Sequence, residues 1–419
     1  MGSDGPGHGS WPAPRRPDFP GTWVIVDTLA PRRNRVSESR KQGGRTRPPV
    51  GFREIAAGGE RRVGVATLDA QATLNALSLE MAERLAMQLD AWATDPAIAV
   101  VVLEGEGRAL CAGGDLQSVY REMRDHRGDD PPRRIARFFE REYGLNHAIH
   151  AYPKPFLCWG NGIVMGGGMG LLIGASHRVV TETSRLAMPE IAIGLFPDVG
   201  MSWALNRMAG KSGLFLGLTG ATLQAADALF AGWADYHIPQ VRKQQVFDAL
   251  ARQTWAGERR ADDLLLHDVL DACHVAPEPV AGPLRRNLDT VAALCRAPAL
   301  DDVIGAILQY DGADPWLEGA RDALAKGAPS TARLAWELQR RTRHMSLAQV
   351  FQLEYQVALW CCTRGDFQEG IRALLIDKDR QPAWKATHGT EVGTAWADKA
   401  FRDMAADFPV PASLRTLAG

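Results

Sequence analysis

The chain has little of what marks a metal site or a disulfide framework. Among its 419 residues there are six cysteines, which are scattered and follow no metal-ligand spacing. They predict free thiols in a reducing compartment. The ten histidines form no H-E-x-x-H pair, so we expect no metal centre.

The chain also lacks an excess of charge of either sign. Its 48 lysines and arginines against 49 acidic residues leave a net charge of -1. Such a balance provides no global field that would attract nucleic acid or an anionic membrane, so we expect neither as a partner. Any anionic ligand must be bound by a few local groups.

No segment predicts a membrane anchor or a leader. The longest apolar stretch, residues 156–175, is long enough to span a bilayer and has Asn161 as its only clearly polar side chain. Seven of its twenty residues are glycine, however, and Pro153 and Pro155 precede it. This composition favours a buried strand, a glycine loop and a closely packed helix. Since the first ten residues contain no apolar signal-peptide core, we expect a cytoplasmic location, or the mitochondrial matrix in a eukaryote.

Composition divides the chain into three regions. Residues 1–50 hold 8 of the 25 prolines and nine basic against four acidic residues. This predicts an extension without a packed core, either a targeting or nucleic-acid-binding tail or a solvated segment. Residues 51–255 alternate apolar runs such as 98–103 with helical patterns such as Ser78 to Pro96, and so predict an α/β core. Residues 256–419 show mainly helical patterns and predict a mostly helical C-terminal region.

Three familiar motifs are incomplete in this chain. A dinucleotide fingerprint starting at Gly166 needs glycine where Leu171 stands. A phosphate-binding loop ending at residues 210–212 needs glycine where Leu205 stands. Residues 200–204 approach a nucleophile elbow but lack its second glycine. The sequence therefore does not support a dinucleotide, nucleoside triphosphate or serine-nucleophile site at these places.

Two glycine-rich segments each follow a predicted strand. In residues 108–116, Gly113 and Gly114 free the backbone for a tight turn or for the approach of an N–H group to a ligand. In residues 161–170, Gly166 and Gly167 precede a predicted buried helix. The start of such a helix concentrates unpaired N–H donors, which suits an oxyanion. The alternative is that these glycines only allow close helix packing.

A third segment, residues 187–200, places two acids in an apolar loop. Glu190 and Asp198 lie among methionine, isoleucine, leucine, phenylalanine and proline. Desolvation in such surroundings raises a carboxyl pKa toward values useful for acid and base catalysis. The alternative is structural, with Asp198 capping a helix and Glu190 forming a salt bridge.

Together these segments resemble the crotonase, or enoyl-CoA hydratase/isomerase, superfamily, and within it most closely the 3-hydroxyisobutyryl-CoA hydrolase family. The resemblance runs from about Val63 to Trp384 and includes residues 369–379 near its end. It rests on Cys-Ala-Gly-Gly-Asp at 111–115, the glycine segment at 161–168, and Met-Pro-Glu with Gly-Leu-Phe-Pro-Asp-Val-Gly at 188–200. It implies an α/β fold, with a crotonase-like ββα spiral core followed by a mostly helical C-terminal region.

The resemblance also implies roles for single residues. The backbone N–H groups of Gly114 and Gly167 match the oxyanion hole that receives the thioester carbonyl. Glu190 and Asp198 match the catalytic acids. Glu190 is then a nucleophile or a general base, while Asp198 orients the acyl hydroxyl or assists proton transfer. Both alternatives for Glu190 remain open at this point.

The implied reaction is hydrolysis of a short 3-hydroxyacyl-CoA thioester, above all 3-hydroxyisobutyryl-CoA as in valine catabolism. Hydratases of the superfamily carry a second glutamate where this chain has Gly170. Glu142 and Asp115 match positions that we expect to contact the substrate. Two alternatives are a hydratase or isomerase that uses Glu190 as its single base, and a catalytically idle acyl-CoA-binding protein. We expect no cofactor besides the CoA of the substrate, and the C-terminal helices leave a homo-oligomer open.

Overall fold

The computed structural model describes residues 48–128, 130–386 and 389–418. They lie in one compact unit, Val36–Gly419. Nearly all of the N-terminal extension that the sequence predicts falls outside the described residues. Val50 begins a strand and is buried, so the described chain is folded from that residue onward. The predicted boundary at residue 255 stays a prediction.

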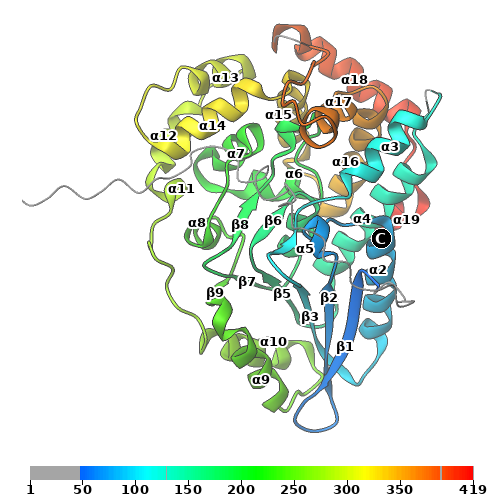
Figure 1. The fold of residues 1–419 in the computed structure, drawn as a ribbon, viewed down its shortest axis with the longest axis vertical. Helices are drawn as coiled ribbons and strands as arrows, with labels where there is room; N and C mark the ends of the chain where they lie inside the picture. The colour runs from blue at the N-terminus through cyan, green and yellow to red at the C-terminus, as the bar shows by residue number, and fades with distance from the viewer. Residues whose placement is uncertain (1–47, 129, 387–388, 419) are drawn as a thin grey trace, which may run out of the picture. The chain divides into compact units, whose positions relative to one another are not determined.

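Two sheets form the centre of the fold (Figure 1). The large sheet has the order β1-β2-β3-β5-β7-β9 and the small sheet the order β4-β6-β8. β1 pairs with β2 in antiparallel orientation, and the other pairings between these described strands are parallel. The large-sheet strands are β1 (Val50–Ala56), β2 (Arg62–Leu68), β3 (Ile98–Gly105), β5 (Phe156–Gly160), β7 (His177–Val180) and β9 (Tyr236–His237). The small-sheet strands are β4 (Ala109–Cys111), β6 (Ile163–Met165) and β8 (Arg185–Ala187).

The two sheets grow together as the chain winds. Each of three successive passes gives one strand to the large sheet and the next to the small sheet, namely β3 then β4, β5 then β6, and β7 then β8. Helices α3 (Leu116–Asp125) and α4 (Arg133–His150) follow β4, and α5 (Gly167–Ile173) follows β6. All of β3 is buried, because helices cover both faces of the parallel sheet. This winding confirms the predicted ββα spiral.

Helix α2 (Leu79–Thr94) covers one face of the large sheet. Ser78 caps it, because its hydroxyl accepts a hydrogen bond from the N–H of Met81 at 3.2 Å. Helices α9 (Lys243–Arg252) and α10 (Arg259–Asp271) cover the other face. Strand β2 divides its side chains between the two faces: Val65 packs toward α9 and α10, and Leu68 toward α2.

Beyond the sheets the described chain is mostly helical, as the sequence predicts. α16 (Leu347–Thr363) contacts α4 and α6 (Met201–Ala204), while α15 (Pro329–Thr342) contacts α6 and α7 (Ser212–Thr219). The C-terminal helices therefore lie against the elements that follow β4 and β8 (Figure 1). The other helices that follow β8 are α8 (Ala225–Phe230), α11 (Pro283–Arg286), α12 (Leu288–Leu294), α13 (Leu300–Leu308), α14 (Pro315–Lys326), α17 (Phe367–Ile371), α18 (Thr394–Asp407) and α19 (Ala412–Arg415).

The apolar stretch at residues 156–175 forms β5, β6 and α5, in agreement with the strand, loop and helix that its glycines predict. None of the helices within the described ranges combines the length and apolarity needed to cross a bilayer.

Candidate active site

The two predicted oxyanion donors are neighbours in space. Gly114 follows β4, where the N–H of Leu77 donates to the carbonyl of Gly113 at 2.7 Å and holds this turn against the start of α2. Gly167 is the first residue of α5. A methyl group added to Gly167 would lie 3.5 Å from the backbone nitrogen of Gly114. In the described part of the chain, neither glycine N–H donates to a protein oxygen, so both donors remain for a ligand.

Close packing explains why glycine stands at the start of α5. A methyl group on Gly167 would lie 2.5 Å from Oε1 of Glu142, and one on Gly168 would lie 2.2 Å from the carbonyl oxygen of Cys111. Gly166 has φ of 49°, in the left-handed region that favours glycine. The glycines thus bring the start of α5 against β4 and against the carboxyl group of Glu142.

Glu190 begins a short 3₁₀ turn, Glu190–Ala192, directly beyond β8. Its side chain is buried, and its Oε2 has no hydrogen-bond partner among the described residues. Burial raises the pKa of Glu190 well above its ordinary value, and the negative charges of Asp198 and Glu142 raise it further. The salt bridge considered from the sequence does not form within the described chain. Glu190 is instead a buried acid without an ion-pair partner among the described residues.

Asp198 lies in the loop between this turn and α6. The hydroxyl of Tyr143 donates to its Oδ2 at 2.7 Å. Burial raises the pKa of Asp198 to about 6, while the hydrogen bond from Tyr143 acts in the opposite direction. Its carboxylate does not cap α6, whose N-cap is Gly200. The next residue, Val199, has φ of 52°, a strained conformation for a β-branched residue.

Glu142 is the third buried acid of the site. It lies on α4 beside Tyr143, and its Oε1 borders Gly167. Burial raises the pKa of Glu142 well above its ordinary value, and the charge of Asp198 adds to this effect. Because the charge of Asp198 raises the pKa of both glutamates, ionisation of Asp198 favours the protonated form of Glu142 and of Glu190.

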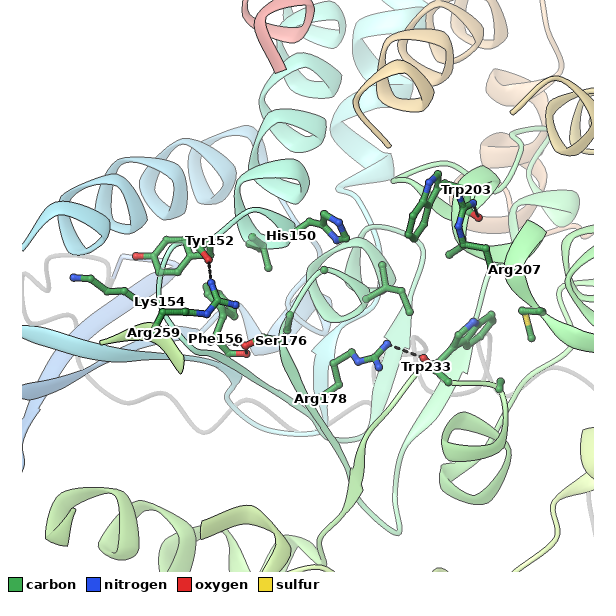
Figure 2. A pocket seen from close by; sticks show the side chains of 18 residues that line it. His150, Tyr152, Lys154, Phe156, Ser176, Arg178, Trp203, Arg207, Trp233 and Arg259 are labelled. Carbon is green, nitrogen blue, oxygen red and sulfur yellow. Dashed lines mark hydrogen bonds between the residues drawn. The ribbon is translucent and has the colours of Figure 1, made fainter. Parts of the chain in front are cut away.

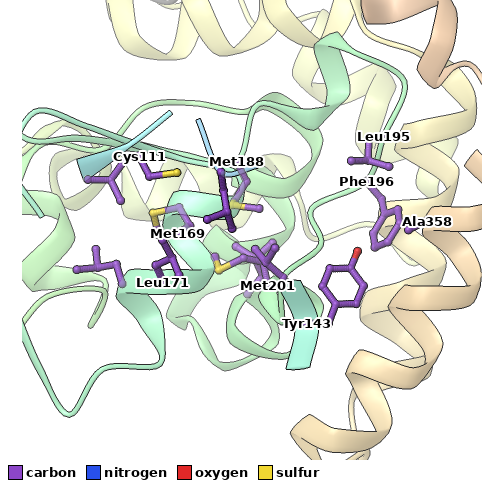
Figure 3. Packing of buried hydrophobic residues seen from close by; sticks show 14 of the residues in the cluster. Cys111, Tyr143, Met169, Leu171, Met188, Leu195, Phe196, Met201 and Ala358 are labelled. Atoms are coloured by element: carbon purple, nitrogen blue, oxygen red, sulfur yellow. The ribbon is translucent and has the colours of Figure 1, made fainter. Parts of the chain in front are cut away.

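Apolar side chains surround these acids. Figure 3 shows Met169, Met188 and Met201 gathered together, with Tyr143 beside Phe196 and the C-terminal helix that carries Ala358. These side chains are buried and exclude water from the acids. The apolar surroundings predicted for residues 187–200 therefore also include side chains from other elements.

Glu354 of α16 holds the loop that carries Asp198. Its Oε2 accepts the backbone N–H of Gly200 at 2.7 Å and its Oε1 accepts the N–H of Ser202 at 3.1 Å. Burial raises its pKa to about 8, although these two hydrogen bonds act in the opposite direction. Neither Glu354 nor Tyr143 was predicted from the sequence. A signal existed for Glu354, since it occupies the buried stripe of α16 with Val350 and Val357.

Two other predicted positions have structural partners. Asp115 caps α3, because its carboxylate accepts the N–H of Ser118 at 3.2 Å and the hydroxyl of Ser118 at 2.6 Å. Its contact with substrate stays a prediction. At Gly170, a methyl group would lie 2.6 Å from Nδ2 of Asn146 and 2.7 Å from Cβ of Val199. The position where hydratases carry a glutamate has no room for one here.

The described residues contain no group of three or more histidine, cysteine, aspartate or glutamate side chains that could hold a metal ion. All six cysteines are buried free thiols. Burial raises the pKa of the Cys111 thiol, next to the glycine turn, to about 12. The thiol therefore stays protonated at neutral pH.

Comparison with known proteins identifies relatives over most of the chain. Residues 63–401 match the family described as enoyl-CoA hydratase/isomerase. The mitochondrial 3-hydroxyisobutyryl-CoA hydrolase of Gallus gallus is 35% identical over 81% of this chain and 86% of its own length. The mitochondrial enzyme of that name from Homo sapiens is 34% identical over 78% of this chain and 83% of its own length.

Solved structures agree with this fold. An enoyl-CoA hydratase from Rhodobacter sphaeroides superposes with a TM-score of 0.73 at 33% identity, over 87% of this chain and 98% of its own. A carnitinyl-CoA dehydratase from Mycobacterium thermoresistibile also superposes with a TM-score of 0.73, at 32% identity over 84% of this chain and 96% of its own.

Proposed function

The chain belongs to the enoyl-CoA hydratase/isomerase family, and on this premise we propose that it hydrolyses the thioester of a short 3-hydroxyacyl-CoA, above all 3-hydroxyisobutyryl-CoA, to the free acid and CoA. The reaction consumes one water, and this assignment places it in valine catabolism. The observation that carries the proposal is the set of acids. Glu190 and Asp198 are buried together, while Gly170 has no space for the second glutamate of a hydratase.

In this proposal the thioester carbonyl oxygen accepts hydrogen bonds from the N–H groups of Gly114 and Gly167. Attack on the carbonyl carbon places negative charge on that oxygen, and two fixed donors stabilise it. One such donor in a site that excludes water typically lowers the barrier by about 3 kcal/mol. The absence of protein acceptors for both N–H groups within the described residues supports this role.

Glu190 acts in the attack on the thioester, as the nucleophile or as the base that activates water. Its ionised carboxylate either attacks the carbonyl carbon, forming an anhydride that water then cleaves, or removes a proton from the attacking water. In both routes the C–S bond breaks and CoA leaves as a thiolate that takes up a proton. The unpaired Oε2 supports a group that is kept free for this step. Since burial raises the pKa of Glu190, the reacting form becomes more abundant as the pH rises.

Asp198 orients the acyl hydroxyl group of the substrate or assists the proton transfer. With a pKa of about 6 it is mostly ionised at neutral pH and can accept a hydrogen bond from the 3-hydroxyl group. Tyr143 fixes its orientation, and Glu354 fixes the loop that carries it. Glu142 borders Gly167 and contributes to the wall beside the carbonyl. We propose no cofactor, because the oxyanion hole supplies the polarisation and CoA is part of the substrate.

The alternative activity is hydration or isomerisation with Glu190 as the single base, and two similar solved structures are named as a hydratase and a dehydratase. The idle acyl-CoA-binding protein is the third possibility. The several relatives named as mitochondrial hydrolases support hydrolysis, and a matrix or cytoplasmic location remains our expectation. A homo-oligomer also stays a prediction.

Release of free thiol from 3-hydroxyisobutyryl-CoA, 3-hydroxypropionyl-CoA and crotonyl-CoA separates these activities. Loss of the enoyl chromophore of crotonyl-CoA is followed in parallel. We expect thiol release from the two hydroxyacyl substrates, reduced by Asp198→Asn. Loss of the chromophore without thiol would establish the hydratase instead. If all three substrates bind but neither signal changes, the chain only binds acyl-CoA.

A further inference from the structure

A cavity that lies apart from the buried acids has a cationic wall. It encloses about 480 Å³. Lys154, Arg178, Arg207 and Arg259 contribute to the wall, and no aspartate or glutamate of the described residues lines it (Figure 2). His150 adds a further ring. A site with this wall attracts an anion.

The cavity lies at the opposite end of α5 from the candidate oxyanion hole. Gly167 begins α5, whereas Gly174 and Ala175, just beyond its last residue, line the cavity. On α4 the same separation holds, because Glu142 faces the start of α5 and His150, two turns later, lines the cavity. The cavity is thus distinct from the place that we propose for the thioester.

Two of the four cations are already paired with carboxylates. Arg178 donates to both oxygens of Asp235, at 2.7 and 2.9 Å, and Arg259 donates to Asp263 at 2.8 Å. These pairs orient the guanidinium groups and reduce their net charge. They make Arg178 and Arg259 secondary partners for a ligand.

Arg207 has no carboxylate partner among the described residues. Its guanidinium lies 3.6 Å from the centroid of the Trp203 ring, and one N–H donates to the carbonyl of Trp203 at 2.7 Å. The stacked ring and this hydrogen bond hold the group in place and leave its other N–H groups available. An oriented guanidinium binds carboxylate or phosphate well, because little side-chain freedom remains to be lost.

Lys154 is the second cation that forms no salt bridge in the described chain, although the negative charge of Asp95 also acts on it. Its ammonium donates to the backbone carbonyls of Trp92 and Asp95, which leaves one of its three hydrogens. Figure 2 shows Lys154 at one end of the cavity and Arg207 at the other. Phe156 and Ile173 give the wall an apolar surface. The cavity therefore has Arg207 at one end and, at the other, Lys154 with one ammonium hydrogen left for a ligand.

We propose that this cavity binds an elongated organic anion with a negative group at each end and an apolar body. Arg207 would bind one end and Lys154 the other, while the apolar surface contacts the middle. The volume suits a small organic molecule rather than a single inorganic ion. The negative groups are carboxylates or phosphates, both of which these cations recognise. Binding in this cavity requires no catalysis and does not depend on the proposed thioester hydrolysis.

The test uses the full chain with its tryptophan indoles labelled with ¹⁵N. Trp203 and Trp233 line the cavity and report on it, and their N–H signals are assigned from Trp203→Phe and Trp233→Phe. The probes are adipate, hexane-1,6-diol bisphosphate and the monoanion butyrate. We expect saturable shifts of both signals with at least one of the two dianions. Whichever dianion binds more tightly identifies the anionic group.

Charge-removing variants locate the binding. Arg207→Ala and Lys154→Gln should each weaken binding of the dianion by about tenfold, as expected for the loss of one charged partner. Glutamine keeps an N–H donor for the carbonyls of Trp92 and Asp95, to which Lys154 donates. Lys154→Gln therefore removes the charge at this end of the cavity and keeps the hydrogen bond. Arg84→Ala is the matched control, because Arg84 is a partly exposed arginine of α2 that does not line the cavity. It should leave binding unchanged.

Three results would overturn the proposal. The first is no saturable shift of either indole signal with either dianion. The second is butyrate binding as tightly as the dianions, which would exclude a ligand held at both ends. The third is equal weakening by Arg207→Ala and Arg84→Ala, which would show only a general charge effect.

Discussion

Replacing Glu354 by glutamine tests how the C-terminal helices support the site. The side chain is fully buried and accepts two backbone N–H groups, from Gly200 and Ser202. Two opposite effects act on its charge. Burial disfavours the carboxylate, and the two N–H groups favour it. Burial is the larger effect, which raises the pKa of Glu354 from 4.5 to about 8.

This balance predicts a pH dependence of stability. Between pH 4.5 and about 8 the folded protein keeps a proton on Glu354 that the unfolded chain has released. The contribution of this group to the free energy of unfolding is therefore complete at low pH and is lost as the pH rises to about 8. At about 1.4 kcal/mol per pH unit, the whole loss is on the order of 5 kcal/mol, of which about 4 kcal/mol falls above pH 5.

The assay is urea unfolding of wild-type and Glu354→Gln protein from pH 5 to pH 9. Glutamine has the same size but no proton to release. It places an amide N–H₂ against one of the two backbone donors, which adds a cost of about 1–3 kcal/mol at every pH. The free energy of unfolding of the variant relative to wild type should therefore rise by on the order of 4 kcal/mol across this range. The other acids of the site are present in both proteins.

A difference that stays constant from pH 5 to pH 9 would refute this reasoning. It would mean that the N–H groups of Gly200 and Ser202 hold Glu354 ionised in spite of its burial. The same variant should also lower kcat for thiol release, because Gly200 follows Asp198 by two residues. A positioning role predicts that Glu354→Asp, which keeps the carboxylate, restores part of kcat, and steady-state kinetics with 3-hydroxyisobutyryl-CoA measures it.

Three further predictions concern the acids and the glycine segment. Glu190→Gln should lower kcat for thiol release by about 10³-fold, with substrate binding nearly unchanged. In the wild-type protein kcat should rise with pH as Glu190 ionises. An unchanged rate in Glu190→Gln would exclude Glu190 from the chemistry. Tyr143→Phe removes the hydrogen bond that lowers the pKa of Asp198, so the acid limb of the pH–rate profile should move to higher pH. If the limb does not move, the ionisation of Asp198 does not control it. Gly170→Glu should destabilise the fold by about 1–3 kcal/mol, because the new side chain meets Asn146. It should not enable hydration of crotonyl-CoA. A gain of hydratase activity would show that position 170 does have room for a glutamate.

Local signals in the sequence sufficed for much of the fold. The helix from Ser78 to Thr94 and the buried strand at 98–105 follow from capping, periodicity and β-branched residues, which act between near neighbours. The glycine segments could be recognised because a backbone that starts a helix against a strand needs residues without a side chain. Glu190 and Asp198 were identified because two acids stand in an apolar run, and their burial agrees with that pattern.

Contacts between distant segments were decided only by the tertiary structure. The carboxyl group of Glu354 meets the N–H of Gly200 across 154 positions of the chain, and the Tyr143 hydroxyl meets Asp198 across 55. No periodicity links such positions, because each partner satisfies the local pattern of its own helix or loop whether or not the other is present. The same holds for Asn146, which occupies the space beside Gly170. The sequence by itself indicated the acids and glycines that we propose for the chemistry, and it indicated which segments become strands and helices. The packing of α4, α5 and α16 decided which of those residues touch and how far they are removed from water, and therefore at what pH they ionise.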